Sequence, residues 1–145
     1  MITCELNQTR LKGGQRLPKK RLQEVLVACT RVLHVKKEVP LSIGFISEKQ
    51  IRALNDAWRQ KDRVTDVLSF ELNEEFLKGE VLLNYEQAKR QALALKHSTR
   101  DEVCFLIVHG VLHLFGHDHE KKQEAQRMFA LQTKILESLG IDSRI

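Results

Sequence analysis

Four of the six histidines in this 145-residue chain lie in one short segment, HGVLHLFGHDH at residues 109–119. His109 and His113 are four residues apart, so on a helix of about 100° per residue they lie roughly 40° apart around the axis and one turn apart along it. His119 follows Gly116, a residue type that readily takes the left-handed conformation that ends a helix and reverses the chain. The spacing therefore predicts three imidazoles that share one metal ion.

Three neutral imidazoles leave a coordination position open, which is typical of catalytic rather than structural zinc sites. The spacing H-x-x-x-H-x-x-G-x-x-H is that of the metzincin proteases, but Gly110 stands where those enzymes carry a glutamate base. The ligands of a protease are thus present while its proton acceptor is missing. Paired histidines at this spacing also arise by chance, but three of them with the glycine between favour a metal site. For His117 the sequence allows two positions, one next to the metal ligands and one on the surface.

Composition and charge limit the kinds of partner and cellular compartment that are expected for this protein. The chain has 24 Lys and Arg against 19 Asp and Glu, a net charge of +5, and a pI near 9.2, which makes a polyanionic partner plausible. Three widely spaced cysteines, Cys4, Cys29 and Cys104, form no C-x-x-C pair, as expected in a reducing compartment. The N-terminus lacks the pattern of a signal peptide, and no apolar run approaches the roughly 18 residues of a membrane span. We expect a soluble cytoplasmic protein.

Two basic clusters are candidate phosphate contacts. Residues 10–21 contain six basic residues, including Lys19 and Lys20, and no acidic one. This segment is either a solvated loop or a contact with a phosphate backbone. The second cluster is Arg59, Lys61 and Arg63; a guanidinium offers paired hydrogen bonds to phosphate and can neutralise charge that develops on a phosphoryl group.

Alternating or β-branched patterns predict four strands, at residues 2–6, 40–46, 67–72 and 79–84. The last two are separated by the polar residues 73–78 and are expected to form a hairpin. Helical spacing predicts five helices: from Pro18 to Leu33, from a Ser47–Gln50 capping box through Trp58, over 85–96, from Ser98 into the histidines, and over 120–139.

Two expectations concern burial. The helix that leads into the histidines is apolar nearly all round, so it should be buried and should hold the metal against the core at its C-terminal end. Trp58 is expected to be a core aromatic residue. A strand followed directly by a helix favours an α/β or α+β architecture. Without repeats or linkers, residues 1–145 are expected to form a single domain.

Two long motifs carry a resemblance to a known family. The segment LN..WR....VTDVLSF at residues 54–70, together with HGVLHLFGHDH and the GEV of residues 79–81, closely resembles the YbeY family. Its members are bacterial metal-dependent endoribonucleases that act in ribosomal RNA maturation and ribosome quality control. The resemblance covers nearly the whole chain and implies a compact α+β fold, with a mixed four-stranded sheet and about five packed helices. It also implies a metal held by His109, His113 and His119.

The resemblance implies roles for other residues as well. Arg59 matches the family's arginine and is expected at the scissile phosphate, with Asp66 as a structural residue close to the ligands. Asp118 would orient a ligand histidine or help to activate water. Two positions depart from the family pattern: Glu80 stands where aspartate is usual, and His117 where tyrosine is frequent.

The expected substrate is single-stranded RNA at the 3′ end of small-subunit ribosomal RNA, with the ribosome as partner and neither DNA nor membrane. Lys61, Arg63, Lys19 and Lys20 would hold the RNA backbone. Zn fits three imidazoles best, while Ni, Cu or Fe stay open. Water and the 2′-hydroxyl of the RNA are both open as the nucleophile. The alternatives are a metalloprotease or amidase, and a non-catalytic ribosome-associated factor with a structural metal.

Overall fold

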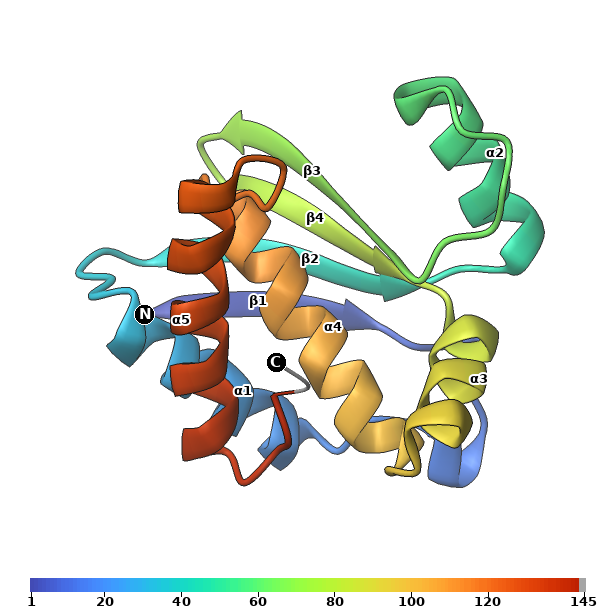
Figure 1. Cartoon of the computed structure of the whole chain (residues 1–145), viewed down its shortest axis with the longest axis horizontal. Coiled ribbons are helices and arrows are strands. Elements are labelled where there is room, and N and C mark those ends of the chain that lie inside the picture. Colours follow the sequence, from blue (N-terminus) through green and yellow to red (C-terminus); the bar gives the residue numbers. More distant parts are fainter. Residues whose placement is uncertain (144–145) are drawn as a thin grey trace.

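The computed structural model describes residues 1–143, and within them the chain forms four strands and five α-helices (Figure 1). The strands are β1 (Ile2–Asn7), β2 (Val39–Phe45), β3 (Val67–Glu74) and β4 (Leu77–Leu83). They form one sheet in the order β1-β2-β4-β3, in which β1, β2 and β4 run parallel and β3 pairs antiparallel with β4. The expectation of a mixed four-stranded sheet is confirmed.

The helices are α1 (Lys19–Val32), α2 (Glu48–Arg59), α3 (Tyr85–Leu95), α4 (Thr99–Leu114) and α5 (Lys122–Ser138). Local signals explain where two of them begin. The Ser47 hydroxyl accepts from the backbone N–H of Gln50, whose side chain returns the bond, so α2 has the expected capping box. The Ser98 hydroxyl accepts from the N–H of Asp101 and begins α4.

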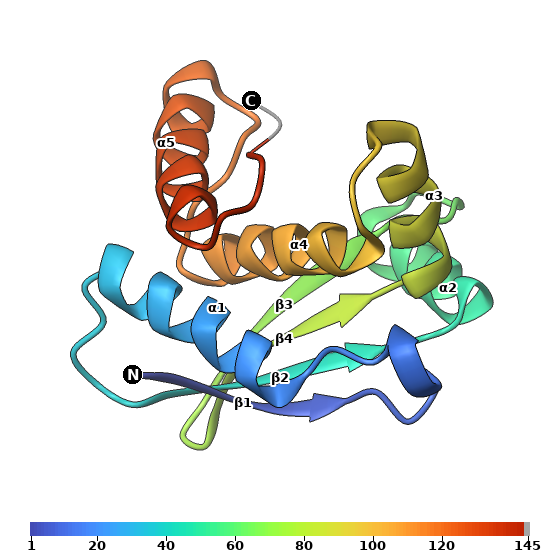
Figure 2. The same cartoon turned by 90° about the horizontal axis from the view of Figure 1, so that it is seen from below.

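The helices are arranged in layers (Figure 2). α1 and α4 lie on one face of the sheet, and α5 packs across both of them on the side away from the strands. α3 packs against α4, whereas α2 stands apart beyond the strand ends, where β2 finishes and β3 begins (Figure 1). The largest buried side chains gather between the sheet, α1, α4 and α5, among them Ile43, Leu112 and Ile135. α4 is therefore the central helix of the core, as expected.

Two glycines let α4 approach the sheet closely. A Cβ at Gly110 would lie 2.8 Å from Val81 Cγ1 and 3.0 Å from Ser69 Oγ, and a Cβ at Gly79 would lie 2.7 Å from Leu114 Cδ2. The Ser69 hydroxyl donates to the Gly110 carbonyl oxygen at 3.0 Å. Position 110 therefore faces the sheet, and no side chain fits there without moving the helix.

The expectation that Trp58 belongs to the core is wrong. Its side chain is 71% exposed and touches Phe70 edge-on, with ring centroids 6.1 Å apart. α2 buries only Ile51 and Asn55, so its C-terminal turn projects from the molecule. A large aromatic residue in an amphipathic pattern predicts burial on average, but α2 has too little of the fold beside it to cover the ring.

The connection between β3 and β4 is shorter than expected. The polar residues 73–78 were expected to form a loop, but β3 runs to Glu74 and β4 resumes at Leu77, leaving a two-residue turn with Phe76 81% exposed. Because β3 is the edge strand and its last four residues are exposed, polar side chains are compatible with strand structure there. Within residues 1–143, no helix combines the length and the apolar character needed to cross a bilayer.

Candidate metal centre

The C-terminal half of α4 presents two imidazoles to the same point. His109 and His113 are one turn apart, and their Nε2 atoms are 3.1 Å apart. Two ligand nitrogens of a tetrahedral zinc site, at about 2.0–2.1 Å from the ion, are separated by roughly 3.3 Å, so this spacing suits a shared ion. Both side chains are half-buried at the edge of the core.

A helix-ending turn brings in the third imidazole. Gly116 has φ +89°, the N–H of His117 donates to the Leu112 carbonyl, and the N–H of Gly116 donates to that of His113, both at 3.0 Å. These bonds form a Schellman motif, as the glycine predicted. The Asp118 carboxylate then accepts the backbone N–H of His119 at 2.7 Å and so fixes the loop that carries the third histidine.

The three histidines form one group. One ring nitrogen from each of His109, His113 and His119 lies within 4.8 Å of the others. Within residues 1–143, this is the only group of three or more His, Cys, Asp or Glu side chains close enough to share an ion. His117 is not part of the group. Three neutral imidazole donors with His119 exposed fit a divalent metal that keeps an accessible coordination position.

Gln132 on α5 fixes the orientation of His109, a role that was not predicted from the sequence. Its Oε1 lies 2.9 Å from His109 Nδ1, and the side chain is 1% exposed. An amide oxygen only accepts, so His109 carries its proton on Nδ1 and presents the Nε2 lone pair to His113 and the metal. The available signal was a glutamine on the buried stripe of α5, one turn after Met128 and one before Leu136.

Burial keeps His113 neutral. Desolvation, followed by the neighbouring charges of His109 and His119, lowers the pKa of His113 to about 4. An imidazole with this pKa has its lone pair available at neutral pH without first losing a proton. Asp118 opposes the shift only weakly.

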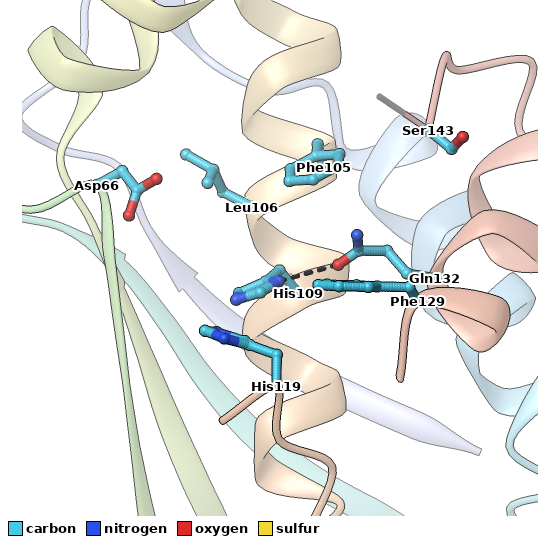
Figure 3. Close-up of a pocket in the computed structure, with 8 residues that line it drawn as sticks. All are labelled: Asp66, Phe105, Leu106, His109, His119, Phe129, Gln132 and Ser143. Carbon is cyan, nitrogen blue, oxygen red and sulfur yellow. Dashed lines mark hydrogen bonds between the residues drawn. The ribbon is translucent and has the colours of Figure 1, made fainter. Parts of the chain in front are cut away.

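Beside the histidines, a cavity of about 410 Å³ opens between α4, α5 and the residue before β3 (Figure 3). His109 and His119 line it in the middle of the view, and Asp66 lies on the side away from Phe129 and Gln132 of α5. Asp66 therefore lines the same cavity as two of the three histidines. The Phe129 ring lies nearly parallel to that of His119, at 16° and 6.2 Å between centroids, and is a second residue that the sequence analysis did not identify.

The predicted phosphate contacts divide into two places. Arg59 is the last residue of α2, and Lys61 and Arg63 lie in the segment that leads to Asp66; all three are exposed and form no ion pair within residues 1–143. Lys19 and Lys20 begin α1 after its N-cap Pro18, and the preceding residues 14–17 share a cavity with the N-terminal turn of α4. His109 lies ten residues farther along α4, about 15 Å away. The structure does not bring Lys19 and Lys20 to the histidines.

Glu80 lies on the face of the sheet opposite the metal centre. Its neighbours Gly79 and Val81 face α4, and its carboxylate accepts from the Ser42 hydroxyl at 3.3 Å on the other face. The departure from aspartate at this position therefore does not alter the histidine group.

Comparisons with known proteins agree over most of the chain. Residues 3–140 match the family described as Endoribonuclease YbeY. Relatives with this name include one from Oceanobacillus iheyensis, 36% identical and covering 83% of this chain and 87% of the relative. The relative from Shouchella clausii is 36% identical and covers 97% of each chain. That from Aquifex aeolicus is 44% identical and covers 70% of this chain and 71% of the relative.

A solved structure has the same fold. The solution structure of a Thermotoga maritima protein superposes with a TM-score of 0.61 at 25% identity, and the match covers 97% of this chain and 92% of that chain.

Proposed function

The chain belongs to the YbeY family of endoribonucleases, and we propose that it is a metal-dependent endoribonuclease that cuts single-stranded ribosomal RNA during maturation of the small-subunit 3′ end and in ribosome quality control. The observation that carries the proposal is the convergence of three imidazole nitrogens within 4.8 Å at the exposed end of a buried helix. A site of this kind is positioned by the core and remains open to a large substrate.

Zn is the metal that we propose, with Ni as the first alternative, because three imidazoles and a tetrahedral spacing suit it. When bound, such an ion supplies Lewis acidity to a phosphoryl oxygen and lowers the pKa of water. The residues of the chain hold it: His109, His113 and His119 donate neutral nitrogens, and Gln132 fixes the donor atom of His109.

The basic residues near α2 supply the contacts with RNA. Arg59 binds the scissile phosphate, and Lys61 and Arg63 bind neighbouring phosphates, because all three side chains are exposed and form no ion pair within the described residues. Asp118 accepts a hydrogen bond from the backbone N–H of His119 and so positions the loop that carries this ligand. Lys19 and Lys20 would contact only a longer RNA that extends over the surface beyond the metal centre.

A peptidase is disfavoured by Gly110. A glutamate at this position would point into Val81 and Ser69 rather than toward the histidines, so the missing base cannot be restored by simple substitution. A cytoplasmic location is proposed with the function, since ribosomal RNA is processed there and Cys4, Cys29 and Cys104 are all free thiols.

The decisive variant is His113→Ala, with His117→Ala as its matched control because His117 is outside the metal group. Bound metal is measured by mass spectrometry, and cleavage is measured on structured and single-stranded ribosomal RNA fragments. We expect His113→Ala to lose metal and cleavage together, and His117→Ala to keep both. Loss of metal with persisting cleavage would assign the activity to a contaminating ribonuclease.

Arg59→Ala separates the enzyme from a non-catalytic ribosome factor. We expect a loss of about 10²-fold or more in kcat/KM with bound metal unchanged, since the arginine neutralises charge on the reacting phosphate. Arg31→Ala, an exposed arginine at the end of α1, is the control for net charge. Full biological activity in Arg59→Ala without RNA cleavage would favour the non-catalytic factor. The RNA ends formed by the wild-type chain identify the nucleophile: a 2′,3′-cyclic phosphate indicates the 2′-hydroxyl.

A further inference from the structure

The cavity beside the metal centre extends beyond the metal ligands to side chains of α4, α5 and the segment before β3. Its volume of about 410 Å³ lies within the roughly 300–1,000 Å³ of small-molecule sites. His109 and His119 line it together with Leu106 of α4 (Figure 3). A chain of nucleotides whose phosphate lies at the histidines must place a neighbouring base close by, and this cavity adjoins the same two side chains.

The walls on the helix side are suited to a flat apolar ring. Phe105 on α4 lies 11° from parallel with His109, at 6.4 Å between centroids, and Phe129 on α5 lies in the same manner against His119. Phe129 is half-buried, so part of its ring remains accessible. Bases stack on aromatic faces regardless of sequence, which provides affinity without selection.

The opposite wall carries a hydrogen-bond acceptor. Asp66 Oδ1 accepts from the backbone N–H of Val67 at 2.8 Å, which holds the carboxylate in place. Asp66 Oδ2 accepts no hydrogen bond from any residue in 1–143. A carboxylate only accepts, so its best complement is a base edge with adjacent donors. On the exposed Watson–Crick edge of single-stranded RNA, guanine presents N1–H beside its amino group, whereas adenine, cytosine and uracil each present one donor site beside acceptors.

We propose that the cavity binds one nucleobase of the RNA, adjacent to the scissile phosphate, and that Asp66 favours guanine at this position. The inference rests on the proposed endoribonuclease function and adds a base-binding site to it. The aromatic walls supply stacking, and Asp66 supplies the preference. The enzyme then has a sequence preference at one position beside the cut, while its phosphate contacts are indifferent to sequence.

The test begins with an RNA oligonucleotide whose cut site has been mapped with the wild-type metal-loaded protein. Single abasic sites are placed at each position around the cut, and kcat/KM is measured for each RNA. We expect a loss of about 5- to 150-fold, the effect of one stacked base, at one position next to the cut and little effect elsewhere. Equal rates along the series would overturn the base site.

Two variants locate the effect in the cavity. Ser143→Trp fills it from the wall formed by the C-terminal segment, so the abasic and intact RNAs should then be cut at similar rates. Lys134→Trp, at an exposed position of α5, is the matched control and should keep the wild-type dependence. Asp66→Asn offers both a donor and an acceptor and should lose the preference for guanine over the other three bases. An unchanged preference would overturn the role of Asp66.

A binding measurement separates this inference from the proposed function. RNA with 2-aminopurine at successive positions loses fluorescence when that base stacks, whether or not the RNA is cut. Quenching by the wild-type protein at one position, abolished in Ser143→Trp, supports the base site even if no RNA is cleaved and the proposed function fails. Absence of quenching at every position would overturn the base site even if cleavage is found.

Discussion

Gln132 determines which nitrogen of His109 faces the metal, and its replacement tests that role. Gln132→Leu keeps the buried volume but removes the acceptor 2.9 Å from Nδ1, so the other tautomer becomes accessible. We expect metal affinity, measured by competition with a chromophoric chelator, to fall about 10- to 100-fold.

The matched variant is Gln132→Glu, which keeps an accepting oxygen at the same place. It should retain metal affinity while Gln132→Leu loses it, because only the glutamate keeps the accepting oxygen; loss of affinity in both variants would contradict the role of the hydrogen bond. Equal affinity in the wild type and Gln132→Leu would show that His109 needs no partner.

His113 gives the metal-free chain a defined pH dependence. Its pKa is about 4 in the fold and about 6.5 in an unfolded chain. Between these values the unfolded chain binds a proton that the folded chain does not, so the free energy of unfolding falls as pH decreases from 6.5 to 4 and is fully present above 6.5. In chelator-treated protein, denaturation across this range should show a steeper dependence for the wild type than for His113→Gln. Identical slopes would contradict the shift.

The close approach of α4 to the sheet depends on Gly110. In an exposed helix, alanine would be favoured over glycine by about 1 kcal/mol, but here its Cβ would lie 2.8 Å from Val81 Cγ1. We expect Gly110→Ala to reduce the free energy of unfolding by about 1–3 kcal/mol through overpacking, as measured by chemical denaturation. Gly44→Ala is the control, because its Cβ would find no atom closer than 3.6 Å. Equal effects of the two changes would mean that α4 shifts freely.

The Schellman turn after α4 serves both stability and the metal, whereas that after α5 serves stability alone. Gly116 and Gly140 have φ +89° and +72°, and each is followed by a residue whose N–H bonds back into its helix. Alanine at either position should cost about 1 kcal/mol.

Only Gly116→Ala should also weaken metal binding, because the turn places His119. Denaturation and chelator competition on Gly116→Ala and Gly140→Ala measure the two effects. A loss of metal affinity in both variants, or in neither, would contradict this division.

At the scale of the whole molecule, the sequence predicts the structural features that depend on residues close together in the chain. The capping residues Ser47 and Ser98, the turn at Gly116 and the common face of His109 and His113 follow from spacing alone, and the structure has all of them. The burial of α4 also follows, because a helix that is apolar all round has no face for solvent.

Features that depend on distant segments were not predicted. Gln132 lies 23 residues from His109 and becomes its partner only because α5 folds back over α4. Trp58 has an apolar pattern but no layer to cover it. Lys19 and Lys20 were grouped with the other basic residues as RNA contacts, yet the nearby residues 14–17 lie at the N-terminal end of α4, away from the histidines. Tertiary contacts, rather than local preferences, determine each of these positions.

Because the three ligands come from the end of α4 and the loop before α5, metal binding should stabilise the whole fold. A metal at about 100 times its Kd adds roughly 2.7 kcal/mol to the free energy of unfolding if the unfolded chain does not bind it, which corresponds to about 5–10 °C in Tm for a chain of this size. We expect this rise for the wild type and for His117→Ala, but not for His113→Ala, in thermal denaturation with increasing Zn. A full rise in Tm for His113→Ala would mean that the ion binds elsewhere. Loss of the rise in His117→Ala would make His117 a ligand, in addition to the group of His109, His113 and His119.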